Sequence, residues 1–475
     1  MKILITVDPH RLKVSPKIPK YLLENLCLYT RYRVDNYEYT VRGQEGWNGY
    51  VNTFNVYKQE APAGLWRRIQ NFFKNEEFDV EVVWAECKPL GKKKPWVHTL
   101  DLAHHQIRSV EAAVKGRYGI IDGAIRSGKT AIMGAILNKI NRTPAIVLTV
   151  GKDLVIQTSR ELERFTDFEV GSLVDSKYEK GEVLVTSYHA LISALKNRSE
   201  TTEKTKQRNK EIRKFVGDTD VLLLDECHYA LAPKTAKALK KLSPAYKIGL
   251  SGTPNREGTQ TTEREAALGP TLCRVSLQQM VEIGRLAKPL TIWYELPAQW
   301  YLKDGIYDFG EDYDSNIIKN AYRNQFIKEI VDNLYSKGKS SFVMVSKIEH
   351  GKELERLIPK SYFVRGAVST KVRWNMYRAV QEGKLSCVIS TVSKLGLDLP
   401  KLNAVINAEG YRSKTSTVQK LRSLTGIEGK RVGLIIDFLD HSKYTQRHSI
   451  QRLKLYKSKQ FVIKKRQVPE DYYGK

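Results

Sequence analysis

The chain has 475 residues, 41% of them hydrophobic, which suits roughly two to four domains with real cores. Its 79 Lys and Arg residues outnumber 52 Asp and Glu residues, and the formal net charge of +27 favours a polyanionic partner. The five cysteines include no CxxC pair, which argues against a zinc site or a disulfide framework. No apolar run approaches the roughly 18 residues of a membrane span, and the N-terminus does not read as a signal peptide. We therefore expect a soluble cytoplasmic protein with no membrane partner.

Residues 1–97 differ from the rest because they are rich in Tyr and Trp and alternate in places like strands. One segment, Gly64–Phe73, has the periodicity of an amphipathic helix. We predict a small α+β domain here, followed by a linker at the basic, Pro-bearing stretch Lys88–Pro95.

From about residue 98 the chain alternates apolar strands with helical patterns, which predicts a parallel sheet flanked by helices. The candidate strands of this first series are Tyr118–Ile121, Ala145–Thr149, Val183–Thr186, Val221–Leu224 and Lys247–Leu250. A second series begins near 325, with Ser341–Val345, Ser361–Val364, Cys387–Ser390, Ala404–Ile406 and Arg431–Asp437. We infer two α/β domains in tandem, joined near 285–320.

Two charged stretches each allow two interpretations. Residues 196–214 predict a solvated helix or loop, or else an insertion that contacts nucleic acid. Residues 445–475, with nine Lys or Arg against two acidic residues, predict a solvated tail or part of a nucleic-acid groove.

The segment Gly123–Thr130 fits the phosphate-loop pattern G-x-x-x-x-G-K-[ST], and it lies between a predicted strand and a predicted helix, Ala131–Leu137. In such a loop the backbone N–H groups surround the phosphates, and the helix N-terminus adds positive potential. Lys129 is expected to reach the β- and γ-phosphates, and the Thr130 hydroxyl to bind Mg²⁺. The predicted ATP-binding residues of the loop are Gly123, Ala124, Ile125, Arg126, Ser127, Gly128, Lys129 and Thr130.

About a hundred residues downstream, Leu222–His228 ends an apolar strand with adjacent carboxylates, Asp225 and Glu226, and then a Cys and a His. Asp225 stands where a strand-end carboxylate holds Mg²⁺ through its water shell. Glu226 is placed to polarise the attacking water as a general base. The two motifs together predict a nucleoside triphosphate site that binds Mg²⁺.

These residues, and the segments between and after them, resemble superfamily 2 helicases of the DExH type. The matching segments of the first domain are Leu102–Ile107, Leu148–Gln157, Val183–Tyr188 and Ser251–Pro254. The resemblance implies adenine recognition by Gln106, contacts to the DNA backbone by Gly151, Lys152, Gln157, Thr186, Ser187 and Tyr188, and coupling of hydrolysis to domain movement by Ser251, Gly252, Thr253 and His228.

In the second domain, Phe342–Ser346 and Ile389–Pro400 resemble helicase motifs IV and V. The implied contacts are Ser346, Lys347 and Thr391 to DNA, and Gly396 and Asp398 to ATP. The expected motif VI departs from the family pattern.

That motif keeps Gln419, but Ser423 and Gly426 stand where the family has two arginines. An arginine finger contributes about 10³–10⁵ in rate, so its absence would slow hydrolysis. We expect Arg422, one position early, to serve with Gln419 in catalysis, and regard Arg412 and Arg431 as weaker substitutes.

The resemblance implies two tandem RecA-like domains after the small N-terminal domain, with boundaries at 1–97 for a DNA-binding domain, 98–285 for the ATP-binding helicase domain 1, and 286–475 for helicase domain 2 with its basic C-terminal segment. Within 1–97, the segments Gly46–Val51 and Ala61–Leu65 resemble the N-terminal domain of UvsW-type phage recombination helicases, which binds duplex DNA. The arginines that could neutralise phosphates there are Arg31, Arg33, Arg42, Arg67 and Arg68. The alternative is that Trp47 and Trp66 are only core residues of this domain.

We therefore predict an ATP-dependent DNA helicase or translocase that remodels forks, Holliday junctions and R-loops, recognises DNA by structure rather than by sequence, and acts as a monomer, in the host cytoplasm if phage-encoded. Three alternatives stay open: a duplex translocase of a restriction or remodelling system, an RNA helicase, and a non-catalytic binding or annealing protein that uses ATP as a clamp.

Overall fold

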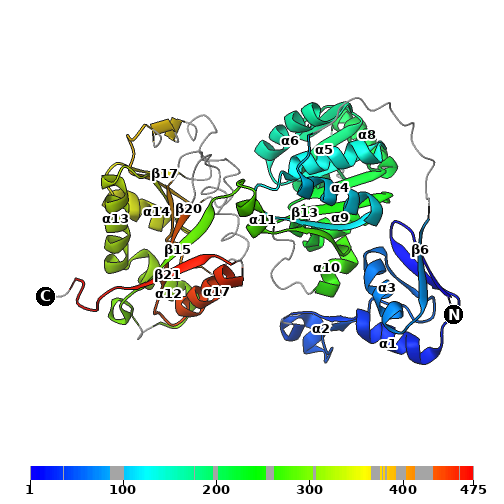
Figure 1. Cartoon of the computed structure of the whole chain (residues 1–475), viewed down its shortest axis with the longest axis horizontal. Coiled ribbons are helices and arrows are strands. Elements are labelled where there is room, and N and C mark those ends of the chain that lie inside the picture. Colours follow the sequence, from blue (N-terminus) through cyan, green and yellow to red (C-terminus); the bar gives the residue numbers. More distant parts are fainter. Residues whose placement is uncertain are drawn as a thin grey trace. The chain divides into compact units, whose positions relative to one another are not determined.

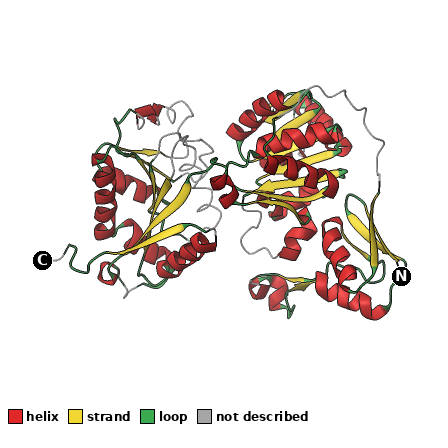
Figure 2. Ribbon diagram, viewed as in Figure 1, coloured by secondary structure: helices red, strands yellow, loops and turns green. Residues whose placement is uncertain are grey.

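The computed structural model describes residues 2–35, 37–85, 101–175, 177–195, 202–252, 261–302, 306–364, 375–376, 378–379, 382–391, 403–411, 432–458 and 460–473. The chain divides into two compact units, Met1–Ser276 and Leu277–Lys475 (Figure 1). Each unit contains one large sheet with helices packed against it (Figure 2). No helix within the described ranges is both long and apolar enough to cross a lipid bilayer.

The N-terminal part of the first unit is a small α+β subdomain. Its described sheet has the order β5-β2-β1-β6 and consists of β1 (Lys2–Val7), β2 (Arg11–Ser15), β5 (Glu60–Pro62) and β6 (Asp79–Trp84). The helices α1 (Lys20–Thr30) and α3 (Trp66–Asn75), with the short turn η2 (Ala63–Leu65) before α3, supply the rest of the core. A smaller part contains β3 (Tyr32–Arg33), η1 (Tyr37–Tyr39), α2 (Val41–Gln44) and β4 (Tyr50–Val51). Alternate residues of β1, namely Ile3, Ile5 and Val7, are buried, as expected of a strand with one face on a core.

The rest of the first unit is a large, mostly parallel sheet. Its order within the described residues is β10-β9-β11-β8-β12-β13-β7-β14, and only β9 and β10 pair antiparallel. The strands are β7 (Tyr118–Gly123), β8 (Ala145–Thr149), β9 (Val170–Val174), β10 (Lys177–Tyr178), β11 (Val183–Ser187), β12 (Val221–Asp225), β13 (Tyr246–Ser251) and β14 (Thr271–Val275). All five strands predicted from the sequence for this domain are therefore confirmed, some of them extended by one or two residues.

Both faces of this sheet are covered, which explains why its strands are continuous apolar runs. Successive residues of β12 alternate between two cores: Leu223 packs with α4, α5 and α6, whereas Leu222 and Leu224 pack with α7, α8, α9 and α10. The helices are α4 (His104–Gly116), α5 (Lys129–Ile140), α6 (Lys152–Phe165), α7 (Tyr188–Leu195), α8 (Glu203–Asp218), α9 (Pro233–Leu239) and α10 (Thr261–Leu268), with the turn η3 (Cys227–Leu231) after β12.

The second unit has a second parallel sheet, in the order β17-β18-β16-β19-β20-β15-β21 within the described residues. Its strands are β15 (Lys288–Glu295), β16 (Ser341–Met344), β17 (Ser361–Val364), β18 (Cys387–Ser390), β19 (Ala404–Asn407), β20 (Val432–Leu439) and β21 (Val462–Gln467). Its helical elements are α11 (Leu277–Glu282), η4 (Ala298–Trp300), α12 (Phe309–Tyr313), η5 (Asp314–Ile318), α13 (Ala321–Ser336), α14 (Ile348–Leu357) and α17 (Thr445–Ser458). The two parallel sheets are those of tandem RecA-like domains, so the predicted fold class is confirmed.

Two segments differ from the sequence prediction. Strand β15 lies in the stretch that we assigned to the join near 285–320, yet it is a full strand between β20 and β21. The stretch 445–475 forms α17 and the edge strand β21, so it is not simply a solvated tail. An edge strand pairs on one side only, which lets β21 be polar and hides it from a search for apolar runs. In the charged stretch at 196–214, the described residues from 203 on belong to the helix α8, one of the two predicted forms, and this helix packs Ile212 and, just beyond the stretch, Val216 into the core. The predicted linker Lys88–Pro95 lies outside the described residues.

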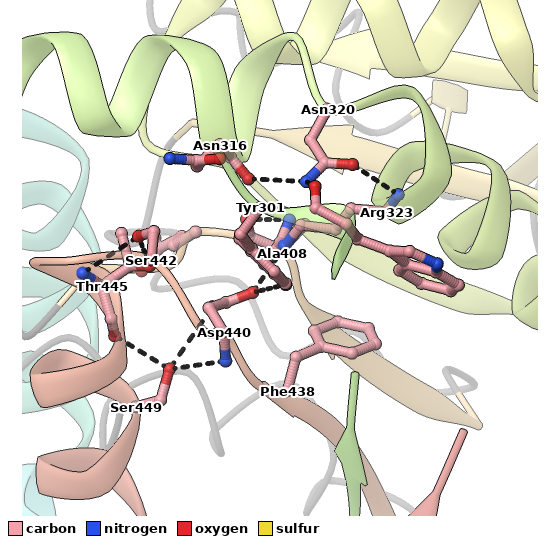
Figure 3. A network of polar contacts seen from close by, with 12 residues as sticks. Tyr301, Asn316, Asn320, Arg323, Ala408, Phe438, Asp440, Ser442, Thr445 and Ser449 are labelled. Atoms are coloured by element: carbon pink, nitrogen blue, oxygen red, sulfur yellow. Dashed lines mark hydrogen bonds and ion pairs between the residues drawn. The ribbon is translucent and has the colours of Figure 1, made fainter. Parts of the chain in front are cut away.

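A buried polar network holds the elements of the second unit together (Figure 3). Arg323 of α13 is fully buried and donates to the Asp440 carboxylate at 2.8 Å and to the Ala408 carbonyl at 3.1 Å. The Tyr301 hydroxyl donates to the same carboxylate at 2.8 Å. Burial alone would raise the pKa of Asp440, but Arg323 and Arg452 outweigh it and hold that pKa below its ordinary value. Removing one partner of such a buried ion pair strongly destabilises the fold, because the other charge is left buried and uncompensated.

Candidate nucleotide site and nucleic-acid interface

The phosphate loop has the backbone that an anion site needs. It connects the end of β7 to the start of α5, and Arg126 and Gly128 both have left-handed backbone angles, with φ of 65° and 76°. Gly128 adopts this conformation without the cost that a side chain would bring. The first N–H groups of α5 have no partners within the helix, and they point into the loop. The Ser127 hydroxyl is buried and has no hydrogen-bond partner among the described residues. These features fit the phosphates of ATP.

Four predicted residues meet at this loop. The Lys129 ammonium lies 3.7 Å from Oε1 of Glu226, and the Ser251 hydroxyl donates to Oε2 of Glu226 at 3.1 Å. Nδ1 of His228 lies 3.3 Å from the Ser251 hydroxyl. Glu226 and His228 are 6% and 7% exposed, and Ser251 is fully buried, so this cluster lies in a medium where charges interact strongly. The structure thus brings the predicted base, the predicted coupling residues and the phosphate-loop lysine together.

The backbone of Glu226 has a positive φ of 46°. For a residue with a side chain this left-handed conformation costs about 1 kcal/mol or more, and such residues cluster at functional sites. The next residue, Cys227, is fully buried and packs against Gly249 of the neighbouring strand, and burial raises the pKa of its thiol. Its role is therefore to pack rather than to react.

Gln106 and a neighbour that the sequence did not single out, His105, hold α4 to the phosphate loop. Nε2 of Gln106 donates to the Ser127 carbonyl at 3.1 Å, and its Oε1 accepts from the Ala103 N–H at 2.9 Å. A ring nitrogen of His105 lies 3.1 Å from the same Ser127 carbonyl. The sequence pattern around Gln106 did not indicate a role for His105, because a histidine in a helix is more often a packing residue than a contact to a functional loop.

Thr130 and Asp225 offer the hard oxygen ligands that Mg²⁺ prefers. Thr130 is the second residue of α5, and Asp225 is the last residue of β12, against which α5 packs. Asp225 is partly exposed, and its Oδ1 accepts from the Glu226 N–H at 3.0 Å while its Oδ2 lies 3.4 Å from the Thr149 hydroxyl. A Mg²⁺ ion that keeps most of its waters, bound through these two residues and the phosphates, fits this donor set.

The predicted DNA contacts of the first unit fall into two groups. Gly151, Lys152 and Gln157 are exposed at the start of α6, where Lys152 is paired with Asp175 at 2.5 Å. In contrast, Thr186 and Tyr188 are buried, and their hydroxyls donate to the carbonyls of Leu173 and Asp225. The Ser187 hydroxyl, partly exposed, accepts from the Ala190 N–H.

In the second unit Ser346 and Lys347 follow β16, and Thr391 follows β18. Because β16 and β18 are adjacent and parallel, these residues lie at the same edge of the sheet. Thr253, Gly396, Asp398, Gln419 and Arg422 lie outside the described residues, so their roles stay predictions.

Comparisons with known proteins agree with this geometry. Residues 99–256 match the family described as "Type III restriction enzyme, res subunit". The chain is 21% identical to the "ATP-dependent DNA helicase uvsW" of Enterobacteria phage T4, over 90% of this chain and 92% of that protein. It is 30% identical to the XPB helicase/translocase subunit of Trypanosoma brucei brucei, over 39% of this chain and 21% of that protein.

Two solved structures share the fold. One is a fragment of a putative HsdR subunit of a type I restriction enzyme from Vibrio vulnificus YJ016, with a TM-score of 0.55, 19% identity and coverage of 80% of this chain and 70% of that one. The other is the ATP-dependent Type ISP restriction-modification enzyme LlaBIII bound to DNA, with a TM-score of 0.56, 14% identity and coverage of 85% of this chain and 34% of that one.

The fold, the phosphate loop and the Asp-Glu-Cys-His strand end resemble those of superfamily 2 helicases of the DExH type, and the similarity to an ATP-dependent helicase agrees with ATP as the energy source. Along almost its whole length the chain is similar to the uvsW helicase of phage T4.

Proposed function

We propose that this chain is an ATP- and Mg²⁺-dependent DNA helicase or translocase that remodels branched DNA, including forks, Holliday junctions and R-loops, during recombination, repair and replication. In this proposal residues 1–97 bind DNA, 98–285 bind ATP, and 286–475 form the second motor domain. One chain contains both motor domains, so we propose a monomer, which acts in the cytoplasm and in that of the host if a phage encodes it.

The observation that most supports DNA as substrate is an arginine–aromatic cluster in the N-terminal subdomain, made of Arg31, Arg33, Tyr37, Trp47 and Tyr50. The Arg31 guanidinium lies 4.3 Å from the centre of the Tyr50 ring, and that of Arg33 lies 4.5 Å from the Tyr37 ring. Trp47 packs edge-on against Tyr37 at 6.2 Å. Arg31, Arg33 and Tyr50 are exposed. Stacked guanidinium and aromatic planes at a surface suit phosphates and unpaired bases, and this favours recognition by DNA structure.

Two of the arginines that we predicted to neutralise DNA phosphates instead contact the first motor domain. Arg68 pairs with Glu265 at 2.7 Å, and Arg67 donates to the Thr271 carbonyl at 3.2 Å. Trp66, only 7% exposed, donates to the Tyr118 carbonyl at 3.0 Å. These three residues fix α3 to the first motor domain, so the core alternative holds for Trp66 but not for the partly exposed Trp47. A DNA-binding surface fixed in this way to a motor domain is suited to hold a junction beside the motor.

A second candidate is a translocase that moves on duplex DNA without separating strands. It is supported by similarity to XPB proteins, whose names include "helicase/translocase", and by the fold shared with restriction-enzyme motors.

The test is ATP hydrolysis and strand displacement by the full chain on single-stranded, duplex, forked and four-way DNA, and on a forked RNA. We expect the greatest stimulation and unwinding with forked or four-way DNA. Lys129→Ala is the control and should abolish hydrolysis and unwinding while DNA binding stays largely intact, because the lysine contacts phosphates of ATP rather than DNA.

Each alternative has its own outcome in this experiment. Triplex displacement without unwinding would favour the duplex translocase, and preferential stimulation by RNA would favour an RNA helicase. Binding without hydrolysis on any nucleic acid would favour the non-catalytic protein and contradict the proposal.

A further inference from the structure

Tyr188 connects a predicted nucleic-acid segment to the ATP site. It is the first residue of α7 and directly follows β11, whose end belongs to the segment Val183–Tyr188. Its side chain is 7% exposed, and burial raises the pKa of its phenol well above the ordinary value, so the hydroxyl keeps its proton. That hydroxyl donates to the main-chain oxygen of Asp225 at 2.9 Å. The bond joins the strand end expected to contact DNA to the backbone of the predicted magnesium ligand.

The sheet brings a second such segment to the same carboxylate. Thr149, the last residue of β8, is fully buried, and its hydroxyl lies 3.4 Å from Oδ2 of Asp225. Strand β8 lies between β11 and β12, with Ser187 opposite Thr149 and Leu224 opposite Leu148. The carboxyl ends of these three parallel strands therefore lie at the same edge of the sheet, and Asp225 is contacted from the ends of both β8 and β11. Of the two contacts the tyrosine bond is the shorter and stronger.

The Tyr188 ring continues the connection toward the predicted base. It stacks on Tyr229 with ring centres 6.2 Å apart, and Tyr229 lies 4.6 Å from the His228 ring. His228 contacts Ser251, which donates to the Glu226 carboxylate. All of these residues lie in the first unit, and each step is a direct packing contact or hydrogen bond.

We infer that Tyr188 is a positioning residue through which nucleic acid bound at the β11–α7 turn sets the geometry of Asp225 and Glu226 and so stimulates ATP hydrolysis. This inference rests on the proposed function. A phosphate bound at the turn displaces the first residue of α7, and the hydroxyl transmits that displacement to the Asp225 carbonyl. The peptide bond after Asp225 connects that carbonyl to Glu226, whose backbone is left-handed. A small rotation of this peptide changes the direction of the Glu226 carboxylate.

The experiment compares Tyr188→Phe with Tyr118→Phe in the full chain. Tyr118 is also buried and also donates to a main-chain carbonyl, that of Pro244 at 2.5 Å, but it begins β7, at the end of the sheet away from the phosphate loop. Each change removes one hydroxyl and keeps the ring. We expect Tyr188→Phe to lower the ratio of DNA-stimulated to DNA-independent kcat by about five- to tenfold, the effect of one hydrogen bond, and to leave the Kd for forked DNA within about twofold. Tyr118→Phe should keep the wild-type ratio.

A wild-type ratio in Tyr188→Phe would overturn the inference and leave the proposed function standing. An equal fall in both variants would also overturn it, because loss of any buried hydroxyl would then explain the effect. A wild-type chain whose hydrolysis no DNA stimulates would contradict the proposed function itself. Thermal unfolding of both variants controls for their stability.

Discussion

Lys247 shows how one charged side chain can weaken a core. It lies on β13, where its ammonium donates to the Ala267 carbonyl at 3.0 Å and faces the Tyr118 ring at 5.4 Å. Burial lowers the pKa of Lys247 to about 8. Below pH 8 this lysine is charged in both the folded and the unfolded chain, and the folded chain bears the full cost of burying that charge.

Between pH 8 and the ordinary value of 10.5 the folded chain loses this proton first. The unfolded chain then binds more protons, so the contribution of Lys247 to stability rises with pH. We expect Lys247→Met to raise the free energy of unfolding by about 1–2 kcal/mol at pH 7. This is less than a fully buried charge would cost, because the side chain is partly exposed. The gain over wild type should shrink at pH 9.5.

Urea unfolding of both proteins at the two pH values measures this difference. Lys241→Met, at an exposed position, controls for the loss of one positive charge. A constant gain at both pH values would show that Met improves packing and that the charge of Lys247 is not the cause.

The nucleotide-site residues were predictable one by one because the phosphate-loop spacing and the paired carboxylates are specific to their chemistry. Lys129, Glu226, Ser251 and His228 indeed lie together. The strand-end residue Tyr188 was less predictable. In a sheet covered on both faces every residue of a strand is apolar or buried, so the sequence does not show which side chain at its end turns inward.

At the scale of elements, the contact between η2 and α10 attaches the N-terminal subdomain to the first motor domain. Gly64 of η2 lies so close to α10 that a Cβ atom there would be 2.0 Å from the Glu265 carbonyl oxygen and 2.9 Å from that of Ala266. Only glycine fits this approach, and the Arg68–Glu265 ion pair lies beside it.

Gly64→Ala should therefore push η2 away from α10 and destabilise this contact by about 1–3 kcal/mol, the usual cost of overpacking. We expect a lower unfolding temperature, and a raised KM for forked DNA in the ATPase assay because the arginine–aromatic cluster is no longer held in place. The KM for ATP should stay near wild type.

Gly217→Ala is the matched control, because a Cβ atom there meets no atom within 4 Å. Gly217 lies in α8, where Ala is favoured over Gly by about 1 kcal/mol, so this variant should be unchanged or slightly more stable. A normal KM for forked DNA in Gly64→Ala, with a lowered unfolding temperature, would show that the contact stabilises the chain without serving DNA binding.

Strands were predictable where an apolar run in the sequence forms a strand that is buried in the sheet. The ten strands proposed from apolar runs are all present, because central strands of a parallel sheet must be apolar on both faces. Strands β9, β10, β14, β15 and β21 of the two large sheets were not predicted, since edge and near-edge strands tolerate residues such as Arg274, Lys288 and Lys464. Their presence depends on pairing with distant segments, which no local pattern reveals.

For the whole molecule, the net charge of +27 can favour DNA in two ways. The entire surface can attract the polyanion, or a local cluster can bind particular phosphates. The two differ in their effect on the salt dependence of binding, because each phosphate neutralised at the interface contributes about −0.9 to the slope of log K against log salt concentration for duplex DNA.

Replacing Arg31 and Arg33 together by Ala should therefore make that slope less negative by about 2 and weaken the binding of forked DNA, as measured by fluorescence anisotropy at several salt concentrations. Lys234→Ala with Lys237→Ala removes the same charge from exposed positions on α9 and should leave the slope nearly unchanged. Equal changes in the two double variants would mean that overall charge, rather than the arginine–aromatic cluster, attracts DNA. A selective change would place part of the DNA on the N-terminal subdomain, outside the sheet edges of the predicted helicase motifs, and would support the proposal that this subdomain gives the chain its preference for branched DNA.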